Sequence, residues 1–142
     1  MKAYELTHEF CREGDEIISS RKSLGFFCSY RSAKDAIQYY STISGFRDNL
    51  DAFSIRERFV CGDVLENVVY EASIYAHSED YETEIAIEIG VYGNKDIAEK
   101  MLDQYCAENE AFVNAKDLIV EKIADRYIIG EKMWAEGFVY TD

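Results

Sequence analysis

The chain has 142 residues, of which 48% are hydrophobic and 14% aromatic, with 28 Asp and Glu against 15 Lys and Arg. This length and composition are typical of a globular protein with one core or two small ones, and they exclude a disordered chain. The net charge of −13 argues against nucleic acid, anionic membranes and acidic substrates as partners, and it favours a basic protein partner.

The charge is unevenly distributed along the chain. Residues 1–62 carry 9 basic and 9 acidic residues, whereas residues 63–142 carry 6 basic and 19 acidic residues. We therefore expect a first unit over 1–62 and an acidic second unit over 63–142, either as two bodies or within one shared globular domain. The acidity belongs to the second unit.

No segment resembles a secretory signal, and no apolar run approaches the roughly 18 residues of a membrane-spanning helix. The four cysteines are widely spaced, without a Cys-x-x-Cys pair or a Cys/His cluster, so they predict neither a zinc site nor a disulfide framework. We expect a cytoplasmic protein that needs no metal or cofactor and does not contact a membrane.

In the first half, extended segments are expected at 3–10 and 24–28, joined through a loop at 11–20. Ser29 is a candidate N-cap for a helix over 30–43, because the apolar residues that follow recur every three to four positions. Residues 53–60 alternate between apolar and polar types and predict a third strand.

In the second half, strands are expected at 67–76 and 81–91 with a loop at 77–81, followed by a helix over 95–107. An added helix is expected over 115–127, and a last strand over 131–140. The segment from Leu24 to Ser29 lines up with that from Ile89 to Asn94, 65 residues later. The predicted fold is α+β, with duplicated ββαβ units that form an antiparallel or mixed sheet and helices mainly on one face. Gly25 and Gly90 are expected to allow close helix-to-strand approach.

The strand over 81–91 is unusually regular. Period-two geometry places Glu82, Glu84 and Glu88 on one face and an apolar row on the other. With Glu79 and Asp80 in the preceding loop, these carboxylates form a candidate acidic recognition face. The alternative is the ordinary solvated face of an antiparallel sheet.

His8 and His77 are the two side chains whose unperturbed pKa lies near neutrality. Together with Tyr30 and Tyr92 they are the candidates for a pocket between the two halves. The alternative for each histidine is a hydrogen-bonded core position.

About half of the chain resembles a small uncharacterised bacterial domain family. The residues that carry the resemblance are Tyr4, His8-Glu9, Gly25-Phe26-Phe27, Ala33, Ala36-Ile37, Gly45-Phe46-Arg47-Asp48, Phe53-Ser54-Ile55 and Trp134-Ala135-Glu136-Gly137-Phe138. In single-unit members the last motif closes the same unit, whereas here about 70 residues intervene, so we expect it at the end of a duplicated second unit. The resemblance implies turns and core anchors, with Trp134 and Phe138 buried, and it implies no activity.

No nucleophile elbow, phosphate-binding loop, zinc-protease motif or dinucleotide fingerprint is present in the sequence. We therefore expect a non-enzymatic protein that binds a basic protein, analogous to immunity proteins or nucleic-acid mimics. One alternative is a small-molecule-binding or enzymatic domain with a Tyr/His-lined pocket. Another is an assembly module that forms a homodimer through its sheet edges.

Overall fold

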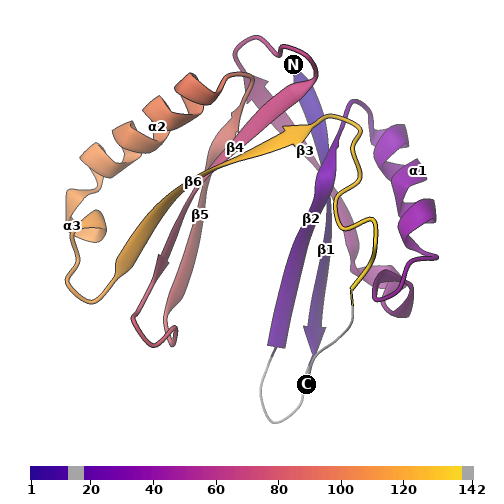
Figure 1. Cartoon of the computed structure of the whole chain (residues 1–142), viewed down its shortest axis with the longest axis horizontal. Helices are drawn as coiled ribbons and strands as arrows, with labels where there is room; N and C mark the ends of the chain where they lie inside the picture. Colours follow the sequence, from indigo (N-terminus) through magenta and orange to yellow (C-terminus); the bar gives the residue numbers. More distant parts are fainter. Residues whose placement is uncertain (13–17, 139–142) are drawn as a thin grey trace. The chain divides into compact units, whose positions relative to one another are not determined.

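The computed structural model describes the backbone of residues 1–12 and 18–138, and the side chains of residues 1–9 and 21–138 (Figure 1). The strands are β1 (Lys2–Arg12), β2 (Ile18–Phe27), β3 (Phe53–Cys61), β4 (Val68–His77), β5 (Glu84–Tyr92) and β6 (Ile119–Ile128). The helices are α1 (Tyr30–Tyr40), α2 (Lys95–Glu108) and the single-turn α3 (Glu110–Val113), with short 3-10 turns at Phe46–Asp48 and Leu50–Ala52. The strand order is β2-β1-β3-β5-β4-β6, in a mixed sheet. The predicted α+β class is confirmed.

The chain forms two compact units. The N-terminal unit contains Lys2–Arg58 and the chain from Ile128 onward, and the middle unit contains Phe59–Tyr127 together with Met1. The chain therefore leaves the N-terminal unit within β3 and returns to it at the end of β6. We call residues 129–138, which follow β6, the closing segment.

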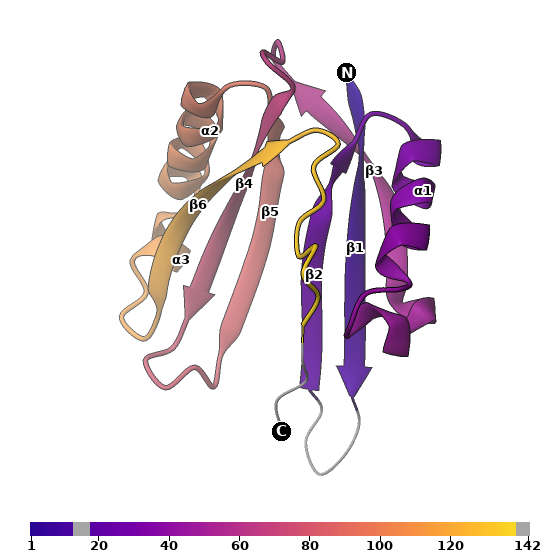
Figure 2. The same cartoon turned by 45° about the vertical axis from the view of Figure 1, so that its right-hand side comes forward.

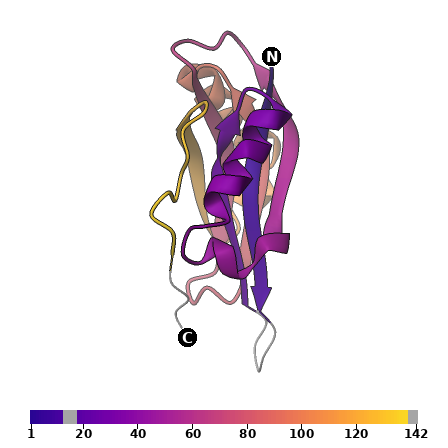
Figure 3. The ribbon, with the colours of Figure 1, turned by 90° about the vertical axis from the view of Figure 1, so that its right-hand side faces the viewer.

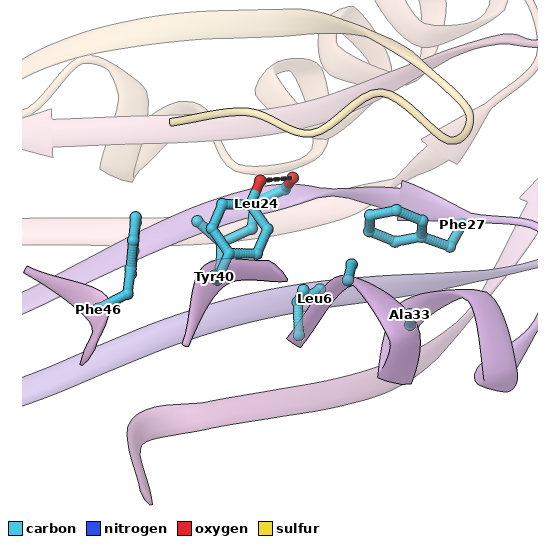
Figure 4. Close-up of a cluster of buried hydrophobic side chains, with 7 residues drawn as sticks. Leu6, Leu24, Phe27, Ala33, Tyr40 and Phe46 are labelled. Atoms are coloured by element: carbon cyan, nitrogen blue, oxygen red, sulfur yellow. Dashed lines mark hydrogen bonds between the residues drawn. The ribbon is translucent and has the colours of Figure 1, made fainter. Parts of the chain in front are cut away.

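The core of the N-terminal unit lies between α1 and the β1–β2 hairpin (Figure 3). Ser29 caps α1, because its hydroxyl oxygen accepts the backbone N–H of Ser32 at 3.0 Å. The buried face of α1 presents Ala33, Ala36 and Tyr40 to Leu6, Leu24, Phe27 and Phe46 (Figure 4). The Tyr40 hydroxyl donates to the carbonyl oxygen of Leu24 at 3.2 Å, so the helix is tied to β2 by a polar contact inside an apolar core.

The closing segment covers the outer edge of β2. Gly130 and Met133 donate backbone N–H groups to Phe26 and Leu24 of β2, at 2.8 and 2.9 Å. The single proton of the Tyr40 hydroxyl is shared between the carbonyl oxygens of Leu24 and Met133. As far as Phe138 this segment contains turns and no strand, so the strand expected over 131–140 is wrong for its described residues; the remainder lies outside them. The contact satisfies part of an edge that would otherwise stay unpaired.

Trp134 and Gly25 lie in surroundings that differ from those expected. Trp134 is 49% exposed rather than buried, although Phe138 of the same motif does pack against the core. Gly25 is needed because a Cβ there would lie 2.5 Å from the carbonyl oxygen of Glu131, in the closing segment, and not because of a helix. A Cβ at Gly90 would meet the Tyr92 side chain of its own strand, at 2.7 Å.

In the middle unit, α2 packs on the β4–β5 hairpin and β6 lies beside β4 (Figure 2). Asn94 caps α2 by accepting the backbone N–H of Asp96 at 2.7 Å. The core consists of Ala72, Ile74, Tyr92, Ala98 and Leu102, with partly buried residues that include Val120 and Ala124 of β6. The helix expected over 115–127 is therefore wrong: most of this segment is β6. The strand expected from residue 81 begins at Glu84, so Glu82 lies in the preceding turn.

The two hairpins share an irregularity at the same place. In the first, Leu6 pairs with Gly25 and Thr7 with Ser23, so one residue of β2 is left over. In the second, Ala72 pairs with Gly90 and Ser73 with Glu88, and one residue of β5 is left over. Within each unit the strand that comes first in the chain is also the central one.

Candidate interaction surface

The charge separation follows the structural units. Residues 59–127 contain 16 Asp and Glu against 5 Lys and Arg, whereas the rest of the chain contains 12 against 10. Most of the net charge of −13 thus belongs to the middle unit. Like charges packed into one small body produce a field that extends into solvent and attracts cations.

In the N-terminal unit, by contrast, the buried carboxylate of Glu5 is paired with basic side chains of the same unit. Glu5 is buried, and it accepts hydrogen bonds from Arg56 at 2.8 Å, from Arg58 at 2.7 Å and from the hydroxyl of Ser23 at 3.3 Å. A buried charge needs such partners to offset its desolvation. These contacts fasten β3 to β1 and have a structural role.

The turn between β4 and β5 holds three of the predicted site residues, Glu79, Asp80 and Glu82, and all are exposed. Asp80 accepts the hydroxyl of Ser78 at 2.7 Å and the backbone N–H of Glu82 at 3.1 Å, and these hydrogen bonds lower the pKa of its carboxyl group. Asp80 therefore orders the turn. Glu79 and Glu82 point into solvent and form no salt bridge with any described residue.

Two further predicted residues, Glu84 and Glu88, lie on the face of the sheet away from α2. Ile87 of β5 packs in the core beneath α2. Because side chains alternate along a strand, Glu84 and Glu88 point away from α2. Both glutamates are exposed. We call this side of the middle unit the helix-free face.

The same face receives two carboxylates from β6 that are not among the predicted site residues. Val120 and Ala124 pack on the helix side, so Glu121 and Asp125 point to the helix-free face, and both are exposed. The sequence predicted a helix for this segment, and a helix would not form part of the sheet that carries Glu84. Glu121 and Asp125 were therefore not predicted as site residues. Only the period-two pattern of a strand would have indicated their position.

Tyr75 lies among these carboxylates. Its hydroxyl donates to Glu84 at 2.5 Å, and this hydrogen bond, followed by burial and the charges of Glu84, Tyr81 and Glu121, raises the pKa of Tyr75 to about 12. The phenol therefore stays protonated and serves as a hydrogen-bond donor. It is unsuited to act as a general base at neutral pH.

His77 is held at the end of β4 and is only 4% exposed. Its Nδ1 donates to the carbonyl oxygen of Ser78 at 2.8 Å, and the ring stacks on that of Tyr81 with centroids 4.2 Å apart. Tyr81 itself is 58% exposed. The histidine therefore supports an aromatic side chain at the tip of the acidic hairpin.

His8 is buried in the N-terminal unit among Phe46, Phe53 and Phe138, with ring centroids 4.9–6.0 Å away. Its Nε2 donates to the carbonyl oxygen of Asn49 at 3.1 Å, while Nδ1 has no hydrogen-bond partner. Burial lowers the pKa of His8; the hydrogen bond to Asn49 opposes this shift, and the charge of Lys22 adds a smaller decrease. The ring is a neutral core residue, as the alternative interpretation expected.

The predicted pocket residues come from both units. His8 and Tyr30 belong to the N-terminal unit, where Tyr30 is 53% exposed at the start of α1. His77 and Tyr92 belong to the middle unit, where Tyr92 is buried in the core. A pocket that the four share stays a prediction.

A groove of about 400 Å³ lies within the middle unit, between α2 and β6. The lining residues are Lys95, Glu99, Leu102, Asp103, Lys122 and Ala124. Lys122 donates to Asp103 at 2.9 Å, and Lys95 lies 3.8 Å from Glu99, so the charges in the groove compensate one another. This lining contains no hydroxyl, thiol or imidazole side chain.

Comparisons with protein-family models, with curated proteins and with solved structures found no match to this chain. Within the described residues, no helix is long and apolar enough to cross a membrane.

Proposed function

We propose that this protein is a non-enzymatic interaction protein that binds a basic protein partner through its middle unit. The observation that carries the proposal is the concentration of 16 acidic against 5 basic residues in one compact unit. Exposed carboxylates on the hairpin turn and on the helix-free face give this charge a defined surface. Immunity proteins and nucleic-acid mimics use acidic surfaces in an analogous way.

The exposed aromatic residue of the hairpin supports the same function. Tyr81 protrudes beside Asp80 and Glu82, and aromatic side chains supply contact area that carboxylates lack. A guanidinium group binds carboxylates and also stacks on aromatic rings, so Arg side chains of a partner match this surface best. The free cysteines Cys28, Cys61 and Cys106 fit a reducing compartment such as the cytoplasm, where we place the interaction.

The test is the salt dependence of partner capture. The immobilised protein is exposed to lysate at low ionic strength, and bound proteins are eluted by increasing salt and identified. We expect a basic partner, because screening weakens contacts between exposed charges. Capture that is insensitive to salt, or capture of acidic partners alone, would contradict the proposal.

A matched pair of variants then locates the surface. Replacement of Glu79, Glu82 and Glu84 by Gln should slow association with the purified partner by roughly tenfold at low salt, because electrostatic steering acts on the on-rate. Replacement of the exposed Asp35, Asp48 and Asp51 by Asn removes the same charge from the N-terminal unit. This control should change the on-rate much less.

We also propose that the two units arose by duplication of one ββαβ unit. The shared bulge beside Gly25 and Gly90 supports this, as do the capping residues Ser29 and Asn94 at equivalent helix starts. The N-terminal unit with the closing segment contains all the motifs of the family resemblance, so the middle unit corresponds to an acidic copy inserted before the last motif. An experimental structure in which the two units fail to superpose would refute the duplication.

A further inference from the structure

We propose that the outer edge of β6 binds an extended basic segment of the partner, which joins the sheet as an additional strand. This inference rests on the proposed function, because it takes the partner to be a basic protein. It adds how the partner is held and which sequence pattern is recognised.

β6 is an edge strand. β6 has 10 residues and ends the order β5-β4-β6, and the described chain places no further strand beyond it. At the other end of the sheet, β2 is covered by Gly130 and Met133 of the closing segment. Within the middle unit, the far side of β5 is paired in part, because Val60 pairs with Val91. An unpaired row of backbone N–H and C=O groups is a template for an added strand.

A second copy of this chain fits the edge poorly. Two copies of β6 related by a twofold axis would pair antiparallel. Each residue would then lie opposite a residue from the same face of the sheet in the other copy. In the two registers of greatest overlap, Glu121 would lie opposite Asp125, or Lys122 opposite Arg126. Like charges directly opposite one another destabilise a strand pair. The edge therefore favours a different partner over the homodimer.

The charge pattern of β6 specifies the partner. Glu121 and Asp125 flank Ile123 on the helix-free face, and Glu121 is close enough to Tyr75 to influence its pKa, with Glu84 hydrogen-bonded to the same tyrosine. On the opposite face Lys122 is bound to Asp103. A strand with Lys or Arg at every second position places all its cations beside these carboxylates, with neutral residues facing Lys122.

The experiment uses the full protein and short synthetic peptides. The probe peptide carries Lys or Arg at alternate positions with Val or Thr between them, and the control peptide has the same composition with its basic residues consecutive. A third peptide keeps the alternation but has every second backbone nitrogen methylated, which removes N–H donors without changing charge. Affinity is measured by titration, and amide hydrogen exchange reports which strand becomes protected.

We expect the alternating peptide to bind roughly tenfold more tightly than the control and to slow exchange in β6, and methylation should abolish the advantage. Glu121→Gln with Asp125→Asn should remove most of that advantage, whereas the matched pair Asp63→Asn with Glu108→Gln should not. Equal binding of both peptides without protection of β6 would overturn edge recognition and leave the proposed function standing. Failure of all basic peptides and proteins to bind at low salt would overturn both.

Discussion

Phe138 donates its backbone N–H to the carbonyl oxygen of Ser44 at 3.0 Å and thereby ties the closing segment to the loop after α1. Its ring lies 4.8 Å from that of Phe46, in a T-shaped arrangement, and 6.0 Å from that of His8. Residues from both ends of the chain thus complete one core. The core of the N-terminal unit therefore includes a residue that follows the middle unit in the chain.

The contact between Gly25 and the closing segment gives the first prediction. Gly25→Ala should destabilise the N-terminal unit, because residue 25 has φ +132° and the added Cβ would lie 2.5 Å from the Glu131 carbonyl oxygen. Gly130→Ala is the matched control, since Gly130 has φ +92° but no atom within 4 Å of the added Cβ. Backbone strain costs each variant about 1–3 kcal/mol. Urea unfolding should show the larger loss for Gly25→Ala, and equal losses would contradict the contact.

The two aromatic residues of the closing motif should differ in their effect on stability. Phe138→Ala removes ring contacts with the core and should lower the free energy of unfolding by about 2–3 kcal/mol, somewhat less than the roughly 3–5 kcal/mol for a fully buried Phe. Trp134 is half exposed, so Trp134→Ala should cost less than about 1 kcal/mol. Thermal unfolding monitored by circular dichroism distinguishes them. A larger loss for Trp134→Ala would contradict this assignment.

His8 predicts a pH dependence of stability. Its pKa is lowered in the folded state from the usual 6.5, because burial and Lys22 disfavour the charged ring. The unfolded chain therefore binds the proton more tightly, so the stability contributed by neutral His8 is complete above about pH 6.5 and declines as the pH falls toward the folded pKa. His8→Phe should flatten this part of the curve, and Lys22→Met should reduce its slope. Denaturant titrations between neutral and mildly acidic pH measure it; identical slopes in all three proteins would refute it.

The sequence predicted most elements but not the role of two segments. Leu118, Ile119 and Ile123 recur at helical spacing, yet the segment is strand β6, because β-branched residues and the open side of β4 favour a strand there. The spacing of residues within the segment gives no information about its pairing with β4. The hydrogen bonds between the closing segment and β2 are tertiary contacts of the same kind, and no local pattern in residues 129–138 specifies them.

In the candidate site too, the sequence predicted the local features and not those that depend on contacts between distant segments. Period-two alternation correctly indicated that Glu84 and Glu88 share an exposed face, since the core beneath them is formed by residues close in sequence. Glu121 and Asp125 join that face only through the β4–β6 pairing, which no pattern in the sequence specifies. The neutral core position of His8 depends likewise on Phe138, at the opposite end of the chain.

Tyr75 provides a direct probe of the acidic helix-free face. Its pKa is raised to about 12, with the hydrogen bond to Glu84 as the largest cause. Glu84→Gln keeps a hydrogen-bond acceptor but removes the charge, so the pKa of Tyr75 should fall toward its ordinary value of 10.0. Glu121→Gln should produce a smaller decrease, because Glu121 acts on Tyr75 through charge alone. Ultraviolet titration of each variant, with Tyr75→Phe to identify the transition, measures the shifts. If Glu121→Gln leaves the transition unmoved, Glu121 does not share the face with Tyr75, and the charge pattern proposed for recognition at β6 loses its basis.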